Sequence, residues 1–176
     1  MTWFWSFVFY SFLGFVLETI YAKITGGNLN RKCLWVLPLC PVYGFGACLI
    51  VGLAYKSDLP LPACFLLGSL LATIAEYFAA LFYEKILHVS FWNYQGLPGN
   101  FQGRVCLLFS FAWGILSLFL VHWVHPQVSL WFSHIPLFLS QFALVTVVID
   151  ALFSAILLRR TGTITCLQWH SQPYTT

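Results

Sequence analysis

The sequence predicts an all-α, polytopic membrane protein with five transmembrane helices, its N-terminus outside and its C-terminus in the cytoplasm. Of the 176 residues, 60% are hydrophobic and 7% are charged, whereas roughly 25% are charged in an ordinary soluble domain. Five apolar stretches are long enough to cross a bilayer, and the basic residues fall on one side of the resulting topology. The lipid bilayer is therefore the expected surroundings, and we expect a multi-pass protein of the cell membrane.

The five predicted spans follow one another with short connections. They cover residues 3–22, 38–55, 61–83, 104–124 and 137–158. Each of the last four begins near residues that are tolerated at helix starts, namely Pro38, Pro41, Pro60, Pro62, Gly103, Arg104 and Pro136. Residues 1–160 are expected to form a single transmembrane domain, and residues 161–176 a polar cytoplasmic tail. Residues 125–135 are apolar but too short to span, so we expect them to lie in the outer interface.

The orientation follows from the Lys and Arg residues, which favour the cytoplasmic side of a membrane protein. With the N-terminus outside, Lys56 faces out and the other seven of the eight basic residues face the cytoplasm. An even number of spans would destroy this asymmetry, so four-helix and six-helix topologies are disfavoured. The N-terminus has neither the basic region nor the cleavage site of a signal peptide. We therefore expect the first helix to remain in the mature protein.

Several functional classes lack their sequence signatures. The basic residues are spread over several loops, which argues against a nucleic-acid partner. No phosphate-binding glycine loop, nucleophile elbow or H-E-x-x-H motif occurs, so no ATPase or hydrolase is recognisable and enzyme activity is left open. His122, His125 and His134 have no carboxylate or cysteine nearby, so neither a metal site nor a cofactor is predicted. The six cysteines show no C-x-x-C spacing and are interpreted as small apolar fillers.

Four of the five acidic residues lie in or at the end of predicted spans, namely Glu18, Glu76, Glu84 and Asp150. The predicted orientation places all four on the cytoplasmic half of the membrane. A charge near the bilayer centre costs on the order of 2.5 to 3.5 kcal/mol, so such side chains should face the helix bundle or a wet cavity. The sequence therefore predicts a polar site in the cytoplasmic half of the bundle.

Helical spacing indicates which side chains share a face with these acids. In the third span every fourth position is a small residue or a carboxylate, namely Gly68, Ala72, Glu76, Ala80 and Glu84. Small or hydroxylic faces also carry Glu18 in the first span and Asp150 in the fifth. Because small residues let helices approach closely, we expect these three faces to converge. The alternative is that each carboxylate only locks the packing, by pairing with Arg31, Arg104, Lys85 or a backbone group.

The connection between the third and fourth spans, residues 85–103, is rich in aromatic and amide side chains and contains several glycines. This composition is typical of a folded loop at the membrane surface. Asn93, Asn100 and Gln102 could bind a polar ligand or satisfy the backbone of the loop itself, and both interpretations stay open. Arg104, at the start of the fourth span, could pair with a carboxylate or receive a phosphate group.

A series of motifs occurs in order between residues 14 and 126. They are GFVLETIY at 14–21, NR at 30–31, PLCPVYGFG at 38–46, EY at 76–77, EK at 84–85, FWNY at 91–94, NFQGRVCL at 100–107, Ser110, WG at 113–114 and HP at 125–126. They resemble the bacterial ABC-transporter type IV (CmpB-like) membrane protein family. The resemblance implies an integral membrane permease.

Seven candidate ligand-binding residues stand at motif positions of that family, namely Glu18, Arg31, Tyr43, Glu76, Glu84, Asn100 and Arg104. An eighth candidate, Asp150, lies beyond the part of the chain that the resemblance covers. The family pattern has an aspartate where this chain has Asn93, and a glycine where it has Lys32. If the family aspartate carries a proton or a cation, this chain has lost that part of the function.

Three functions are compatible with these observations. The first is a transporter or permease subunit whose inner cavity is lined by the acids, amides and arginines, and which acts as a homo-oligomer or with a separate ATPase subunit. The second is a lipid-headgroup-binding protein or lipid-modifying enzyme, in which Glu18 or Glu76 acts as a general base beside Arg104. The third is a structural scaffold whose polar residues only set helix packing.

Overall fold

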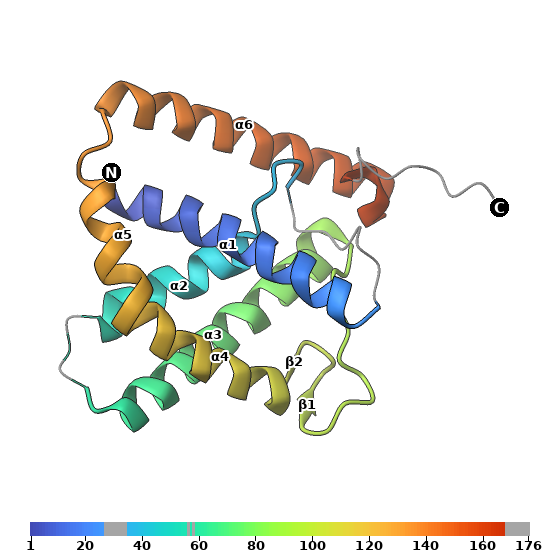
Figure 1. Ribbon diagram of the computed structural model, residues 1–176. Coiled ribbons are helices and arrows are strands. Elements are labelled where there is room, and N and C mark those ends of the chain that lie inside the picture. The colour runs from blue at the N-terminus through green and yellow to red at the C-terminus, as the bar shows by residue number, and fades with distance from the viewer. Residues whose placement is uncertain (27–34, 56, 58, 168–176) are drawn as a thin grey trace.

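The computed structural model describes residues 1–26, 35–55, 57 and 59–167, so Arg31 lies outside the described residues (Figure 1). The helices are α1 (Thr2–Ile24), α2 (Pro41–Ala54), α3 (Leu61–Phe82), α4 (Leu107–Phe119), α5 (His125–Phe132) and α6 (Leu137–Thr161). The π-helical turns η1 (Tyr83–Leu87) and η2 (Leu120–Val124) follow α3 and α4, and the 3-10 turn η3 (Ile164–Leu167) follows α6. A short antiparallel pair, β1 (Asn100–Phe101) and β2 (Val105–Cys106), precedes α4.

Four helical segments of the described chain are long and apolar enough to cross a membrane, which confirms an all-α, multi-pass membrane protein. They are Thr2–Ile24, Leu61–Leu87, Leu107–Phe132 and Leu137–Thr161. Large apolar side chains are exposed along them, as lipid-facing surfaces require. The start of α1 and the end of α6 lie at opposite ends of the molecule (Figure 1). An odd number of crossings has this property, and the count of five and its orientation stay predictions.

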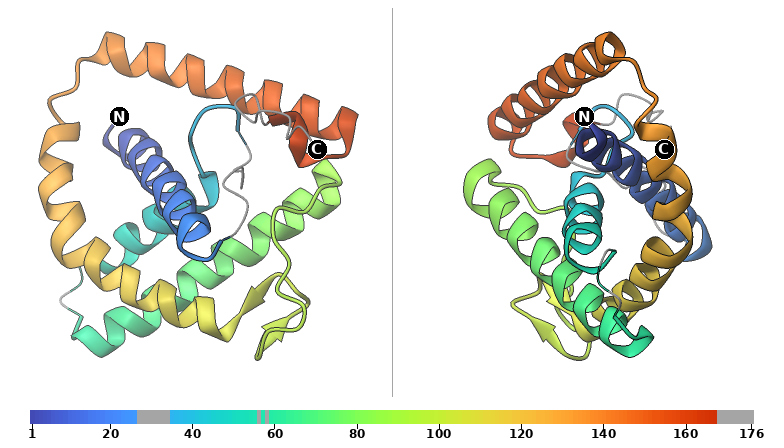
Figure 2. Two further views of the ribbon diagram at one scale, coloured as in Figure 1. Left: turned by 45° about the vertical axis from the view of Figure 1, so that its right-hand side comes forward. Right: turned by 90° about the vertical axis from the view of Figure 1, so that its left-hand side faces the viewer.

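The second predicted span, residues 38–55, is shorter in the structure. Its helix α2 has 14 residues and is about 21 Å long at 1.5 Å per residue, whereas the hydrocarbon core of a bilayer is about 30 Å thick. The helix begins at Pro41, because the residue before it, Cys40, has an extended backbone and a residue that precedes proline disfavours the helical region. The apolar residues before Cys40 therefore form an irregular connection beside α1 and α6 (Figures 1 and 2).

The fourth predicted span and the stretch after it differ most from expectation. Residues 100–106 form the β1–β2 pair, so the helix begins at Leu107 and not at Arg104. Residues 125–132 form α5, which continues α4 and η2 as one bent helix, Leu107–Phe132 (Figure 1), and the position of this segment at the outer interface stays a prediction. Pro126 therefore lies inside this continuous helix, where it has no N–H to donate to the preceding turn and where proline bends a helix. The wider η2 turn directly before it accommodates the bend.

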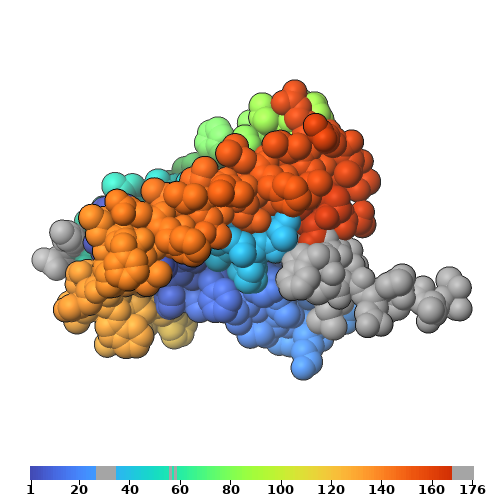
Figure 3. Space-filling view, turned by 90° about the horizontal axis from the view of Figure 1, so that it is seen from above, coloured from blue at the N-terminus to red at the C-terminus, as the bar shows by residue number. Residues whose placement is uncertain are grey.

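The helices α1, α2, α3 and α4 pack together, and α6 runs along one side of this group (Figures 1 and 2). The space-filling view shows α6 lying along the upper face, next to the segment that leads into α2 (Figure 3). Near its start, α6 is joined to α1 by a hydrogen bond of 2.9 Å from Trp5 Nε1 to Ser140 Oγ. Near its end, it packs in an apolar cluster that contains Tyr83, Leu87 and Leu158.

Small residues make the closest helix contacts, as the spacing predicts. At Gly68 of α3, a Cβ atom would lie 2.2 Å from Ser117 Oγ of α4. No side chain fits at this distance, so glycine is required for the two helices to approach. The cysteines are less uniform: Cys64 and Cys106 are buried and free, as apolar fillers would be, but Cys40 is disulfide-bonded. The filler interpretation is wrong at Cys40, because an apolar neighbourhood does not reveal whether a second thiol is within reach.

Candidate functional site

A cavity of about 210 Å³ lies between the four packed helices and the loop after η1. We call it the central cavity. Its wall is formed by one face of α1 between Tyr10 and Glu18, by Cys40 and one face of α2, by Ala72 and Glu76 of α3, by Tyr83 and the loop residues Phe91, Trp92 and Tyr94, and by parts of α4 and η2. Aromatic and aliphatic side chains make up most of this wall. Among the described residues that line it, the two with carboxyl groups are Glu18 and Glu76.

Glu76 is the most deeply buried acid in the described chain, with 4% of its surface exposed. It lies in α3, one turn after the cavity residue Ala72. The Tyr94 hydroxyl donates a hydrogen bond of 2.8 Å to Oε1, and the Trp113 indole Nε1 donates one of 3.0 Å to Oε2. Both donors are neutral. A carboxylate has about four acceptor sites, so Glu76 keeps acceptor capacity for a further partner.

Glu18 enters the same cavity from α1. Its Oε1 accepts a hydrogen bond of 2.7 Å from the Tyr43 hydroxyl of α2, and the Tyr43 ring meets the Trp113 ring edge-on with 5.2 Å between centroids. Tyr43 and Trp113 therefore connect the two acids. The Tyr43 ring packs directly on Gly14, where a Cβ atom would lie 2.3 Å from it. The glycine one turn before Glu18 thus makes room for the tyrosine that contacts Glu18.

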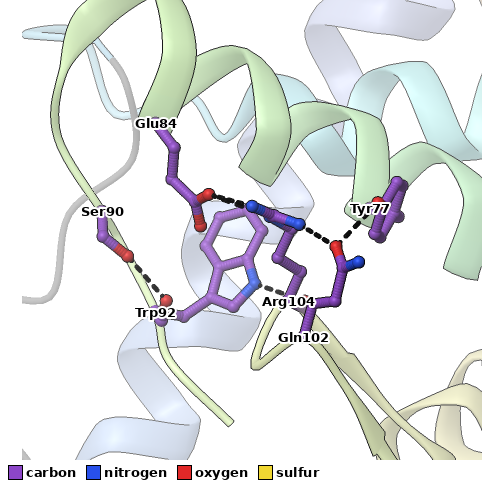
Figure 4. Close-up of polar contacts among 6 residues, drawn as sticks. All are labelled: Tyr77, Glu84, Ser90, Trp92, Gln102 and Arg104. Carbon is purple, nitrogen blue, oxygen red and sulfur yellow. Dashed lines mark hydrogen bonds and ion pairs between the residues drawn. The ribbon is translucent and has the colours of Figure 1, made fainter. Parts of the chain in front are cut away.

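Glu84 belongs to a different cluster, outside the central cavity (Figure 4). Its Oε2 accepts hydrogen bonds from Arg104 Nε at 2.9 Å and Nη2 at 2.6 Å. Arg104 also donates to Gln102 Oε1, which accepts a second hydrogen bond of 3.0 Å from the Tyr77 hydroxyl. The hydrogen bond to Glu84 raises the pKa of Arg104 above its usual value, so this side chain stays charged. We call this the Glu84–Arg104 cluster.

The loop amides satisfy the backbone of their own loop. Asn100 donates a hydrogen bond of 2.8 Å to the Leu97 carbonyl and accepts one of 3.3 Å from the Gly103 N–H. Asn93 Oδ1 accepts a hydrogen bond of 2.9 Å from the Gln95 N–H. An aspartate at this position would be an equally good acceptor in such a turn. Neither amide lines the central cavity.

Asp150 also lies away from the cavity lining. Its Oδ2 accepts a hydrogen bond of 3.2 Å from the Leu37 N–H, and Ser154 Oγ one turn later accepts one of 3.1 Å from the Val36 N–H. Asp150 and Ser154 therefore fix the irregular segment before α2 to α6. The expected convergence of three acidic faces is confirmed for Glu18 and Glu76, and it is wrong for Asp150. Helical spacing shows which residues share a face but not which neighbour that face meets.

Two site residues were missing from the sequence-based candidates, Tyr94 and Trp113. Trp113 is distinguished in the sequence as a tryptophan far from either end of a predicted span, which indicates a position inside the bundle. Tyr94 has no comparable signal. It reaches Glu76 because the loop folds back under α3 and α4, where its ring stacks on Phe109 with 4.8 Å between centroids.

Comparison with known protein families identifies a match over most of the chain. The sequence model of the family described as "Putative ABC-transporter type IV" matches residues 5–157. This range includes all eight candidate residues, Asp150 among them. No curated protein matches the chain, and no solved structure does.

Proposed function

Since the chain belongs to the ABC-transporter type IV family, we propose that it is the membrane-embedded permease subunit of a transport system and that the central cavity holds the transported solute. The observation that carries this proposal is Glu76, a buried carboxylate in the wall of a cavity between transmembrane helices. Acids within a membrane commonly mark substrate pathways. Pockets with apolar walls and a few polar groups are the usual form of a small-molecule site.

A separate subunit is proposed as the source of energy. The 176-residue chain contains no phosphate-binding glycine loop, and an ABC system requires ATP hydrolysis. We therefore propose an ATPase partner, with or without self-association of this chain. The partner would bind at the end of the molecule formed by η1, the following loop and the β1–β2 pair, which the charge distribution assigns to the cytoplasm.

The alternatives have less support. A phosphate-bearing lipid headgroup needs a cation, but Arg104 is engaged by Glu84 and has no contact with Glu76. A scaffold role suits the Glu84–Arg104 cluster and Asp150, whose contacts are within the protein. It does not account for a cavity of about 210 Å³ with two acids in its wall.

The test is ATP-dependent translocation by a reconstituted complex. The chain is purified from its native membranes with its co-purifying ATPase and placed in liposomes with a small-molecule extract of the same cells. Solutes that cross in the presence of ATP are then identified by mass spectrometry. Ala72→Phe, which fills the cavity, should abolish translocation. Leu70→Phe adds a ring at a site on the same helix that is 58% exposed and should not.

Two results would refute the proposal. One is that no solute moves in an ATP-dependent manner although the complex hydrolyses ATP. The other is that Ala72→Phe transports as well as Leu70→Phe, which would place the solute path outside the central cavity.

A further inference from the structure

We propose that the central cavity binds a small organic cation, whose charged nitrogen is held by the Glu76 carboxylate and packs against the rings of Tyr43 and Trp113. This inference rests on the proposed function, because it names the class of solute for the same cavity. It follows from the charge, the aromatic lining and the size of the cavity.

Lys, Arg and His are absent from the part of the cavity lining that the structure describes. The two hydrogen-bond donors to Glu76 are a phenol and an indole, which carry no charge. An ionised carboxylate removed from water is unfavourable, so it either takes up a proton or is accompanied by a cation. A cationic ligand would supply the missing charge, whereas an anionic ligand would add a second repulsive one.

Glu76 and Glu84, which are spaced to lie on one face of a helix, have different partners. Glu84 lies eight positions after Glu76 and has a bidentate partner in Arg104. Its exposed fraction is 31%, so water also stabilises its charge. Glu76 is 4% exposed and has neutral partners. The described chain thus provides a cation for Glu84, which water also stabilises, and neutral donors for the buried Glu76. This difference indicates that the charge of Glu76 serves a ligand and not the packing of helices.

The aromatic lining of the central cavity favours an organic cation over a metal ion. Aromatic ring faces attract ammonium groups through cation–π interactions, most strongly for tryptophan. The Tyr94 hydroxyl and the Trp113 indole N–H each donate to one Glu76 oxygen, and the Tyr43 ring meets the Trp113 ring edge-on, so aromatic side chains line the cavity beside this acid. Hard metal ions instead require six or more oxygen ligands or several bound waters. The described residues contain no group of three His, Cys, Asp or Glu side chains placed to hold a metal, so an organic cation suits this cavity better.

The volume of the central cavity limits the size of the cation. An engineered apolar cavity of about 150 Å³ holds one benzene molecule. The central cavity, at about 210 Å³, has room for a single aromatic ring or a compact alkyl group bearing one ammonium. Cations with several fused rings, long polyamines and peptides are too large.

The test measures binding of three probes of one shape to the purified chain in lipid nanodiscs. Benzylamine is cationic at neutral pH, benzyl alcohol is neutral and benzoate is anionic. Equilibrium dialysis measures binding, and quenching of tryptophan fluorescence reports on the aromatic wall. Benzylamine should bind at least about tenfold more tightly than the alcohol, as expected for a hydrogen bond to a charged group, and benzoate should bind most weakly.

Matched variants locate the site. Glu76→Gln should weaken benzylamine binding about tenfold or more and leave benzyl alcohol binding nearly unchanged. Glu84→Gln removes an acid from the same helix stripe outside the cavity and should change neither. Ala72→Phe should block both probes. Should Glu76→Gln fail to fold, the comparison of the three probes on the parent chain still decides the question.

The inference is overturned if the alcohol or benzoate binds as tightly as benzylamine, if no probe binds, or if Glu76→Gln binds benzylamine like the parent. Its failure is distinguishable from failure of the transport proposal. If a neutral or anionic solute is translocated and Ala72→Phe blocks this translocation, the transport proposal is supported and the proposal of a cationic solute is refuted. Glu76-dependent benzylamine binding without ATP-dependent translocation would do the reverse.

Discussion

The Trp113 indole of α4 donates a hydrogen bond to the Glu76 carboxylate of α3, with 3.0 Å between Nε1 and Oε2. Tyr94 of the following loop donates to the other oxygen at 2.8 Å. One acid is thus held by side chains from a second helix and from a loop. These contacts hold Glu76 in the wall of the central cavity, and substitution of Trp113 tests them.

Removing the indole donor should destabilise the protein. Trp113→Phe keeps an aromatic ring but leaves one Glu76 oxygen without its partner, and a lost hydrogen bond to a buried charged group costs about 1 to 3 kcal/mol. We expect a lower melting temperature in detergent. Trp123→Phe, at a position that is 59% exposed, is the matched control and should melt like the parent. An unchanged melting temperature for Trp113→Phe would show that this hydrogen bond is not formed.

The contact between Gly68 and Ser117 should set the distance between α3 and α4. Gly68→Ala places a methyl group 2.2 Å from Ser117 Oγ, and overpacking of this kind costs about 1 to 3 kcal/mol. Ser117→Gly should restore part of the loss in the double variant, which thermal melting measures. Gly52→Ala is the control, because the nearest atom to its Cβ is 3.5 Å away. Strict additivity of Gly68→Ala and Ser117→Gly would contradict the contact.

A double-mutant cycle should separate the roles of Glu76 in α3 and Glu84 in η1. Glu84→Gln and Arg104→Gln remove the same ion pair, so the double variant should melt little below either single variant. Glu76 and Arg104 have different hydrogen-bond partners, so the effects of Glu76→Gln and Arg104→Gln on the melting temperature should add. Non-additivity of the second pair, with additivity of the first, would show that Arg104 serves Glu76 after all.

The predicted topology can be checked by cysteine labelling in intact cells. Cys64 is unsuitable because it is buried, so exposed positions are used instead. Ser57→Cys, between α2 and α3, should react with an impermeant maleimide from outside. Gln95→Cys and Thr165→Cys should react only after permeabilisation. Labelling of Thr165→Cys in intact cells would exclude five spans with the C-terminus inside.

The sequence predicts most of the helices because hydropathy and length report directly on membrane crossing. It does less well where apolar residues are not helical, as before Pro41, or where a proline lies within a continuing helix, as at Pro126. The Glu76 stripe follows from spacing along one helix. Its partner Tyr94, the pairing of Arg104 with Glu84 and the position of Asp150 depend on how distant segments meet, and periodicity along one helix does not contain that information.

The attachment of α6 has a mechanical consequence. In lipid, apolar helix faces gain little by meeting each other, because the acyl chains are equally apolar. Away from the apolar cluster at its end, α6 is joined to the described chain by the bonds of Ser140 with Trp5, Asp150 with Leu37 and Ser154 with Val36. At roughly 0.6 kcal/mol for each such bond in a membrane, these three bonds contribute about 2 kcal/mol to the attachment of α6. The bonds of Asp150 and Ser154 hold the irregular segment that leads to Cys40 and Pro41, which line the central cavity. A displacement of α6 that kept these two bonds would therefore also displace the segment before α2 and, with it, the wall of the central cavity.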